Sequence, residues 1–217
     1  MTGARKPAKR GRPSHLSRRK TPTQQRAHAT VESIFQATEE LIRARGFSNV
    51  GTRAIAERAG VSVGSLYQYF PTYESVLLAW YENVAAAAAR TMKLATVSVL
   101  DKPLHESVQV TVTALLDLFE EHELVLIRMP SEVPEIARAT SATSFECLNR
   151  GAIRIYFAQH HEFDPKDTDR HIFFIESTLM SVLRRYVTEK PRYLTRSAVI
   201  AQVGRFITAY LEGSLTV

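Results

Sequence analysis

Apolar residues recur along most of the chain at the spacing of helices, and the alternating pattern of a β-strand bounded by hairpin turns is absent. In the first periodic stretch, one helical face carries Ile34, Phe35, Thr38, Leu41 and Ile42. Gly46 follows this stretch and is typical of the residue that ends a helix. The pattern therefore predicts a helix over about residues 24–45.

The same spacing predicts helices along the rest of the chain. Two short ones stand on either side of Gly60, and Pro134 opens another short one. The remaining predicted ranges are about 72–97, 104–122, 123–129 (ending at Met129-Pro130), 141–161, 168–188 and 195–212. The chain is therefore predicted to be all-α, with about nine helices.

The two short helices around Gly60 have the spacing of a helix-turn-helix. Counted from Thr52, the small Ala56 is fifth, Gly60 is ninth and the apolar Leu66 is fifteenth. Such a motif needs a small residue where the helices cross, a turn with glycine-like freedom and an apolar residue that packs back. Thr52 and Ser62 are the predicted N-caps. The alternative is a pair of ordinary amphipathic helices joined by a glycine.

In a helix-turn-helix, the second helix enters the major groove with its N-terminal residues near the base edges. The residues in that position are Ser62, Val63, Gly64, Ser65 and Gln68. Gln68 can bond an adenine edge, and Val63 can touch a thymine methyl group. Gly64 lets the backbone approach the DNA closely.

Three hydroxyl groups are candidates for phosphate contacts. Tyr67 and Tyr69 carry hydroxyls far enough from the backbone to reach a phosphate, although either can equally be a core residue with a solvated hydroxyl. Thr52 stands at a helix N-terminus, where the helix dipole favours an anion.

Positive charge is concentrated at the N-terminus. Residues 1–30 hold nine Lys and Arg and no acidic residue, which exceeds the net charge of +6 of the whole chain. The segment 1–22 is expected to be a disordered basic arm that suits a polyanion, either nucleic acid or an anionic membrane surface, or that serves only as a solvated tail. Its Arg10-Gly11-Arg12-Pro13 run resembles an AT-hook core. Arg10 and Arg12 would then enter a narrow A·T minor groove, and general attraction to phosphates is the alternative.

A family resemblance rests on the helix-turn-helix residues. The run resembles the DNA-binding domain of the TetR/AcrR regulators over about residues 25–77, through Gly46-Phe47, Thr52, Ile55-Ala56, Ala59-Gly60-Val61-Ser62, Gly64-Ser65-Leu66-Tyr67 and Tyr69-Phe70. The resemblance implies that Tyr69 holds a phosphate. Tyr73 stands where the family usually has a lysine that contacts a phosphate. The tyrosine hydroxyl can replace that contact, but it carries no positive charge.

The resemblance also implies three domains. These are a disordered basic arm (1–22), a three-helix helix-turn-helix domain (23–72) and a larger helical domain (73–217) for effector binding and dimerisation. In the family, the last two helices of each subunit form a four-helix dimer interface. The candidates for it are Ile172, Ile175, Leu179, Leu183, Val199, Val203, Phe206, Ile207 and Tyr210. The same faces can also cover the core of one subunit.

An effector pocket is expected among the middle helices. Its apolar candidates are Trp80, Leu116, Phe119, Ile127, Phe145 and Phe174, each of which also suits an ordinary core position. These residue types favour an apolar or aromatic effector.

Other functional classes have weaker support. His160, His161 and His171 lie near three aspartates, but no regular metal-ligand spacing and no catalytic motif is present. The single cysteine excludes an internal disulfide and a cysteine metal cluster. No apolar stretch reaches the ~18 residues of a membrane span, and the basic N-terminus lacks the apolar core of a signal peptide. We therefore expect a cytoplasmic protein without enzyme activity, cofactor, metal or membrane partner.

The sequence thus predicts a homodimeric, sequence-specific DNA-binding regulator. The family resemblance favours a repressor that a small-molecule effector releases from a palindromic operator. The alternative is an architectural DNA-binding protein without an effector, and binding of the arm to a membrane surface rests on charge alone.

Overall fold

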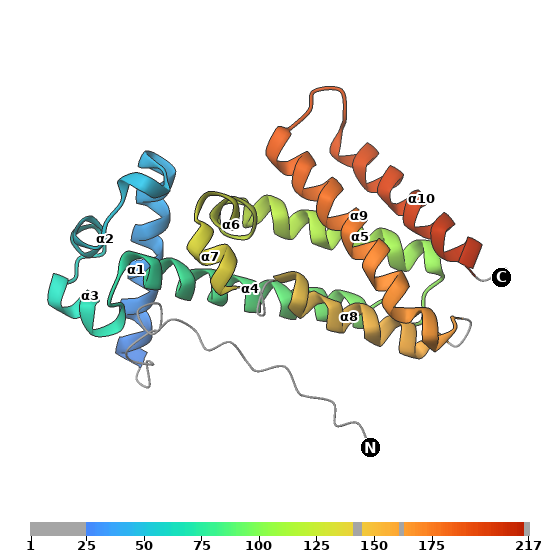
Figure 1. Ribbon diagram of the computed structural model, residues 1–217, viewed down its shortest axis with the longest axis horizontal. Coiled ribbons are helices and arrows are strands. Elements are labelled where there is room, and N and C mark those ends of the chain that lie inside the picture. The colour runs from blue at the N-terminus through green and yellow to red at the C-terminus, as the bar shows by residue number, and fades with distance from the viewer. Residues whose placement is uncertain (1–24, 141–144, 161–162, 215–217) are drawn as a thin grey trace, which may run out of the picture. The chain divides into compact units, whose positions relative to one another are not determined.

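The structure is a computed structural model that describes residues 25–140, 145–160 and 163–214. Within these ranges the chain forms ten α-helices and no β-strand, so the predicted all-α fold is confirmed (Figure 1). The chain divides into two compact units, Met1–Trp80 and Tyr81–Val217. Helix α4 (Tyr73–Val97) begins in the first unit and ends in the second.

The N-terminal unit is a small helical domain built from α1 (Gln25–Arg45), the 3₁₀ turn η2 (Phe47–Asn49), α2 (Thr52–Arg58), α3 (Val63–Tyr69) and the start of α4. α2 packs against both α1 and α3. Ile34, Ile55, Leu66 and Phe70 are completely buried, and the rings of Phe35 and Phe70 lie 6.0 Å apart. One apolar core therefore fixes the three short elements.

The predicted helix ends of this unit are confirmed. Gly46 and Gly60 have φ angles of 76° and 68°, which glycine adopts without strain. The Ser62 Oγ accepts a hydrogen bond of 3.0 Å from the backbone N–H of Ser65 and so caps α3. Thr72 and Ser75 cap α4, because the side chain of each accepts a hydrogen bond from the backbone N–H of the other.

One predicted cap is wrong. Thr52 is the first residue of α2, and the extended Gly51 is its N-cap. The side chain of Thr52 instead lies against α3, where its Oγ1 is 3.1 Å from the Tyr67 hydroxyl oxygen.

The C-terminal unit contains the end of α4 and the helices α5 (Leu104–Glu121), α6 (Met129–Glu132), α7 (Pro134–Ala139), α8 (Phe145–Gln159), α9 (Thr168–Glu189) and α10 (Arg196–Ser214). α5, α9 and α10 pack against one another, and α8 packs against α9 (Figure 1). The core of this unit includes the fully buried Leu115, Leu116, Phe119 and Leu183.

The helical path does not end at Pro130, contrary to the prediction. A π-helical segment, η3 (Glu123–Arg128), follows α5 and leads directly into α6. Pro130 stands in the first turn of α6. Backbone N–H groups in the first turn have no acceptor within the helix, so a proline, which lacks this group, fits there. The predicted range 123–129 thus corresponds to η3, and α6 is an additional short helix that the sequence pattern did not predict.

Replacing Gly60 with alanine is expected to lower the free energy of unfolding by about 1–2 kcal/mol, because a Cβ disfavours a positive φ. The matched control is Gly64→Ala. Its new Cβ would lie 3.9 Å from the Ser62 Oγ, an ordinary contact, and alanine is the better helix former. Urea denaturation of both variants measures the difference, and equal stability of the two would contradict this account of the turn.

Candidate nucleic-acid interface and effector cavity

Helix α3 has one buried face and one solvent-facing side. Leu66 is fully buried and Tyr69 is nearly so, whereas Val63, Gly64, Tyr67 and Gln68 are exposed. This arrangement follows from the packing of α2 against α3, which fixes the rotation of the short helix. Four of the five predicted base-contacting residues are therefore exposed, and three of them, Val63, Gly64 and Gln68, lie on α3 itself.

The two predicted serines are engaged within the turn. Ser62 caps α3, and its Oγ lies 2.8 Å from the Oγ of Ser65. Ser62 is exposed and Ser65 is half-buried. These hydroxyls therefore hold the start of α3 in shape, and contact with a base edge would compete with their mutual hydrogen bond.

Two predicted phosphate-binding hydroxyls meet at the junction of α2 and α3. Thr52 and Tyr67 are 15 residues apart in sequence, yet their hydroxyl oxygens are 3.1 Å apart. Arg53, which the sequence analysis did not single out, is exposed next to Thr52 and forms no ion pair with the described residues. By contrast, Arg43 and Arg58 pair with Glu39 and Glu40. Arg53 is thus a cation available to a phosphate at this junction.

Tyr73 departs from its expected role. Its hydroxyl donates a hydrogen bond of 3.0 Å to the backbone carbonyl of Phe47. The side chain is half-buried, and this burial, with a smaller contribution from Glu74, raises the pKa of its hydroxyl. Because its only hydrogen is used inside the unit, Tyr73 holds η2 against α4 and cannot at the same time donate to a phosphate. Arg10 and Arg12 lie outside the described residues.

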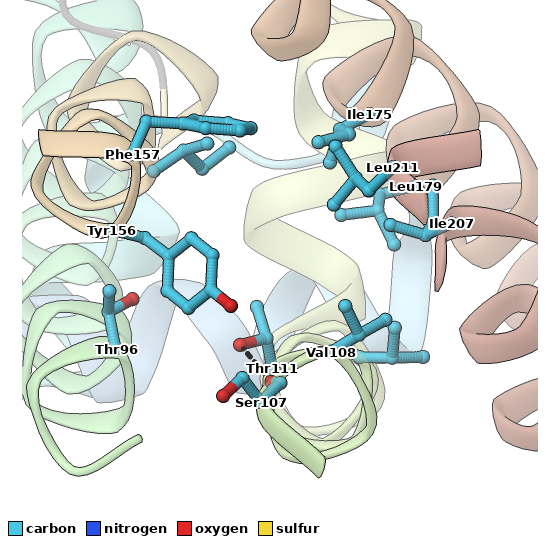
Figure 2. Close-up of a pocket in the computed structure, with 12 residues that line it drawn as sticks. Thr96, Ser107, Val108, Thr111, Tyr156, Phe157, Ile175, Leu179, Ile207 and Leu211 are labelled. Carbon is cyan, nitrogen blue, oxygen red and sulfur yellow. Dashed lines mark hydrogen bonds between the residues drawn. The ribbon is translucent and has the colours of Figure 1, made fainter. Parts of the chain in front are cut away.

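The C-terminal unit contains a partly open cavity of about 60 Å³, to which α4, α5, α8, α9 and α10 each contribute (Figure 2). Hydroxyl groups gather on one side of it, from Thr96, Ser107, Thr111 and Tyr156. The other side is apolar and includes Ile175, Leu179, Ile207 and Leu211. Of the described residues, those that line the cavity include no side chain charged at neutral pH.

None of the five predicted pocket residues whose side chains the structure describes lines this cavity. Trp80, Leu116, Phe119 and Ile127 are buried in the core, Phe174 is 49% exposed on α9, and the side chain of Phe145 lies outside the described residues. An apolar residue type predicts that the side chain is buried. It does not predict whether that side chain packs against other side chains or lines a cavity. The hydroxyl side of the cavity has no signature in the hydrophobic pattern.

Most of the predicted dimer residues also point inward. Seven of the nine are buried within one subunit: Ile172, Ile175, Leu179, Leu183, Val199, Val203 and Ile207. Phe206 is 60% exposed and Tyr210 is half-buried. The exposed apolar side chains of these two helices are Phe173, Phe174, Val182 and Phe206. These seven side chains cover the core of the subunit, and the dimer interface stays a prediction.

The histidine–aspartate segment does not form a metal site among the described residues. His171 is buried, its Nδ1 lies 3.1 Å from the Tyr210 hydroxyl oxygen, and its ring lies 5.5 Å from that of Phe157. Burial, and then the charge of Arg170, lower the pKa of His171. His161 lies outside the described residues. None of the helices in the described ranges is both long and apolar enough to cross a membrane.

A helix-turn-helix unit followed by a larger helical unit defines a class of DNA-binding regulators. The family model described as bacterial regulatory proteins, tetR family, matches residues 34–80, and the model described as tetracyclin repressor-like, C-terminal domain, matches residues 103–211. These matches cover most of the chain, and the chain belongs to the TetR family of transcriptional regulators.

Solved structures share the fold. One is a protein assigned to the TetR family from Syntrophomonas wolfei, with a TM-score of 0.68 and 18% identity over 84% of this chain and 95% of that one. Another is the fatty acid degradation regulator FadR from Bacillus halodurans, with a TM-score of 0.60 and 15% identity over 87% and 97%. A TetR-family regulator from Streptomyces coelicolor has a TM-score of 0.55 and 17% identity over 85% and 99%. No curated protein sequence matches the chain significantly.

Replacing Tyr73 with phenylalanine is expected to lower the free energy of unfolding by about 1 kcal/mol, because the carbonyl of the buried Phe47 loses this donor. Affinity for duplex DNA should change little. The control is Tyr67→Phe, whose exposed hydroxyl should matter less for stability and more for DNA. Urea denaturation and DNA titration measure both, and unchanged stability with weakened DNA binding would return Tyr73 to the phosphate contacts.

Proposed function

We propose that this protein is a sequence-specific, homodimeric repressor that a small-molecule effector releases from a palindromic operator. The observation that carries the proposal is the solvent-facing side of α3, where Val63, Gly64 and Gln68 lie together above a buried Leu66. A helix held in this way can enter a major groove with its N-terminal residues foremost.

The composition of α3 favours operators rich in A·T pairs. The helix Val63–Tyr69 contains no arginine or lysine, the residue types that most often read guanine. Gln68 fits an adenine edge and Val63 fits a thymine methyl group. Thr52, Arg53 and Tyr67 would bind the neighbouring phosphates. Tyr69, which is nearly buried, is the fourth proposed phosphate contact.

The basic arm completes the proposed interface. Arg10 and Arg12 would enter the minor groove next to the site read by α3, where a narrow A·T groove attracts arginine. In this assignment, residues 1–22 are the arm, residues 23–72 form the DNA-binding domain, and residues 73–217 serve effector binding and dimerisation.

Dimerisation is assigned to the outer faces of α9 and α10. Phe173, Phe174, Val182 and Phe206 expose apolar surface there, and a shallow groove that includes Val182, Gln202 and Phe206 runs between the two helices. Apolar side chains exposed together on neighbouring helices are typical of a surface that a partner covers. A second copy of the chain would bury them in a four-helix arrangement.

The proposed switch acts through α4. This helix of 25 residues, about 37 Å long, begins at Tyr73, directly after the helix-turn-helix, and reaches the cavity through Thr96 in its last turn. A dimer fits an operator only when its two recognition helices are about one helical turn of DNA apart, ~34–36 Å. An effector that favours one position of α4 would alter that spacing and so release the DNA.

Replacing Gln68 with alanine is expected to relax base preference at one position in each half-site, at a cost of about 1–3 kcal/mol in discrimination. Selection of bound fragments from genomic DNA by the purified protein measures this preference. The control is Gln109→Ala, an exposed glutamine on α5, which should leave the selected motif unchanged. Uniform recovery of all fragments by the wild-type protein would refute the operator and favour an architectural DNA-binding protein.

Replacing Phe206 with glutamate is expected to weaken the dimer at least tenfold, because a carboxylate would be buried without a partner. Sedimentation equilibrium measures the dissociation constant. The control is Leu94→Glu, which changes an even more exposed apolar residue on α4 and should leave the dimer intact. A dimer unaffected by Phe206→Glu would place the interface elsewhere.

A further inference from the structure

The cavity of the C-terminal unit has a chemical polarity that specifies its ligand. Resting on the proposed function, we propose that the effector is a small uncharged compound with a hydroxyl donor at one end and an apolar body, that is, a phenol or an alcohol. The hydroxyl would lie among Thr96, Ser107, Thr111 and Tyr156, and the apolar body against Ile175 and its neighbours (Figure 2).

Three of the four hydroxyls on the polar side have already used their hydrogen. The Thr96 hydroxyl donates to the Met92 carbonyl at 3.0 Å, and the Thr111 hydroxyl donates to the Ser107 carbonyl at 2.8 Å. The Ser107 hydroxyl donates to the Val99 carbonyl at 2.9 Å. A hydroxyl has one hydrogen and two lone pairs, so each of these groups can only accept from a ligand. The polar side therefore selects a ligand that donates.

The Tyr156 hydroxyl is the fourth hydrogen-bonding group on the polar side of the cavity. Figure 2 shows its hydroxyl directed toward Thr111 and Ser107, across the polar side of the cavity. Its ring stacks on that of His160 at a centroid distance of 4.1 Å, which fixes the direction of the hydroxyl. A ligand hydroxyl between Tyr156 and Thr111 can donate to one oxygen while it accepts from the other, as an ether or a hydrocarbon cannot.

The lining disfavours a charged ligand. The described residues around the cavity provide no cation for a carboxylate and no carboxylate for an amine. An ion moved into such surroundings loses its hydration without compensation, and the cost exceeds what a few neutral hydroxyls return. Carboxylic acids and amines should therefore bind far more weakly than the matched neutral compounds.

Size sets a further limit. The cavity of about 60 Å³ is smaller than the ~150 Å³ of a closed apolar cavity that accepts benzene, so a compound with one ring is held entirely inside it only if the lining moves. Thr96 of α4 is part of that lining, and Tyr156 of α8 faces α5 across it. A ligand that displaced these side chains would favour other positions of α4 and α8, and the proposed switch requires such a preference.

The test uses four probes of matched shape: 4-methylphenol, 4-methylanisole, p-xylene and 4-methylbenzoate. Binding to the full-length protein is measured by calorimetry and by the shift in thermal unfolding. We expect 4-methylphenol to bind about fivefold tighter than 4-methylanisole, the effect of one net hydrogen bond, and 4-methylbenzoate to bind weakest. Equal binding of the phenol, ether and hydrocarbon, tightest binding of the benzoate, or no binding of the phenol at millimolar concentration would overturn the proposal.

Variants locate the interaction. Thr111→Val removes one acceptor with little change of shape, and Tyr156→Phe removes the other hydroxyl; each should abolish the preference for phenol over ether. The matched control is Thr113→Val on the same helix, because the Thr113 hydroxyl makes the same kind of hydrogen bond, to Gln109, and does not line the cavity. A preference that persists in both Thr111→Val and Tyr156→Phe would place the ligand elsewhere.

The proposal of a repressor and the proposal of its ligand class can be refuted independently. If the protein selects an operator that 4-methylphenol does not release but 4-methylbenzoate does, the ligand class is wrong and the repressor stands. If the protein selects no operator while the calorimetric preference and its loss in Thr111→Val are observed, the ligand class stands and the repressor is wrong.

Discussion

The burial of Leu66 and Phe70 fixes which side of α3 meets solvent, and the rest of the DNA-binding unit depends on it. A helix of seven residues is too short to hold its shape alone, so its orientation comes from the core that it joins. Gly60 supplies the positive φ that turns the chain toward this core, and Ser62 caps the first turn. The outward position of Gln68 is a consequence of these inward contacts.

Helix α4 belongs to both units, and the proposed switch depends on that continuity. α4 starts with the Thr72–Ser75 cap and a tyrosine that is bonded to η2, and it ends with a threonine on the cavity. A rigid helix transmits a displacement at one end to the other without intervening side-chain rearrangements. The Tyr73–Phe47 hydrogen bond thus links η2 to the first turn of the helix whose other end reaches the cavity.

The apolar residues of α9 and α10 lie in three different surroundings. Leu183 and Val199 form the core, Ile175 and Ile207 line the cavity, and Phe206 remains exposed. All five lie on α9 and α10 and belong to the same residue class. Their surroundings differ because each residue is turned by about 100° around the helix axis from the one before it. Which of them face α5 depends on how α9 and α10 pack against that helix.

The sequence by itself determined the all-α fold, most of the helices and several of their ends, and the resemblance to the family. Apolar periodicity, the glycines at positions 46 and 60 and the cap at Ser62 act over a few residues, so local physics decides them. Tertiary structure alone decided the rest: the bonding of Tyr73 to Phe47, the approach of Thr52 to Tyr67, and the separation of cavity from core. Each of these joins residues far apart in the chain, and no local spacing encodes which side chains packing will bring together or where it will leave a void.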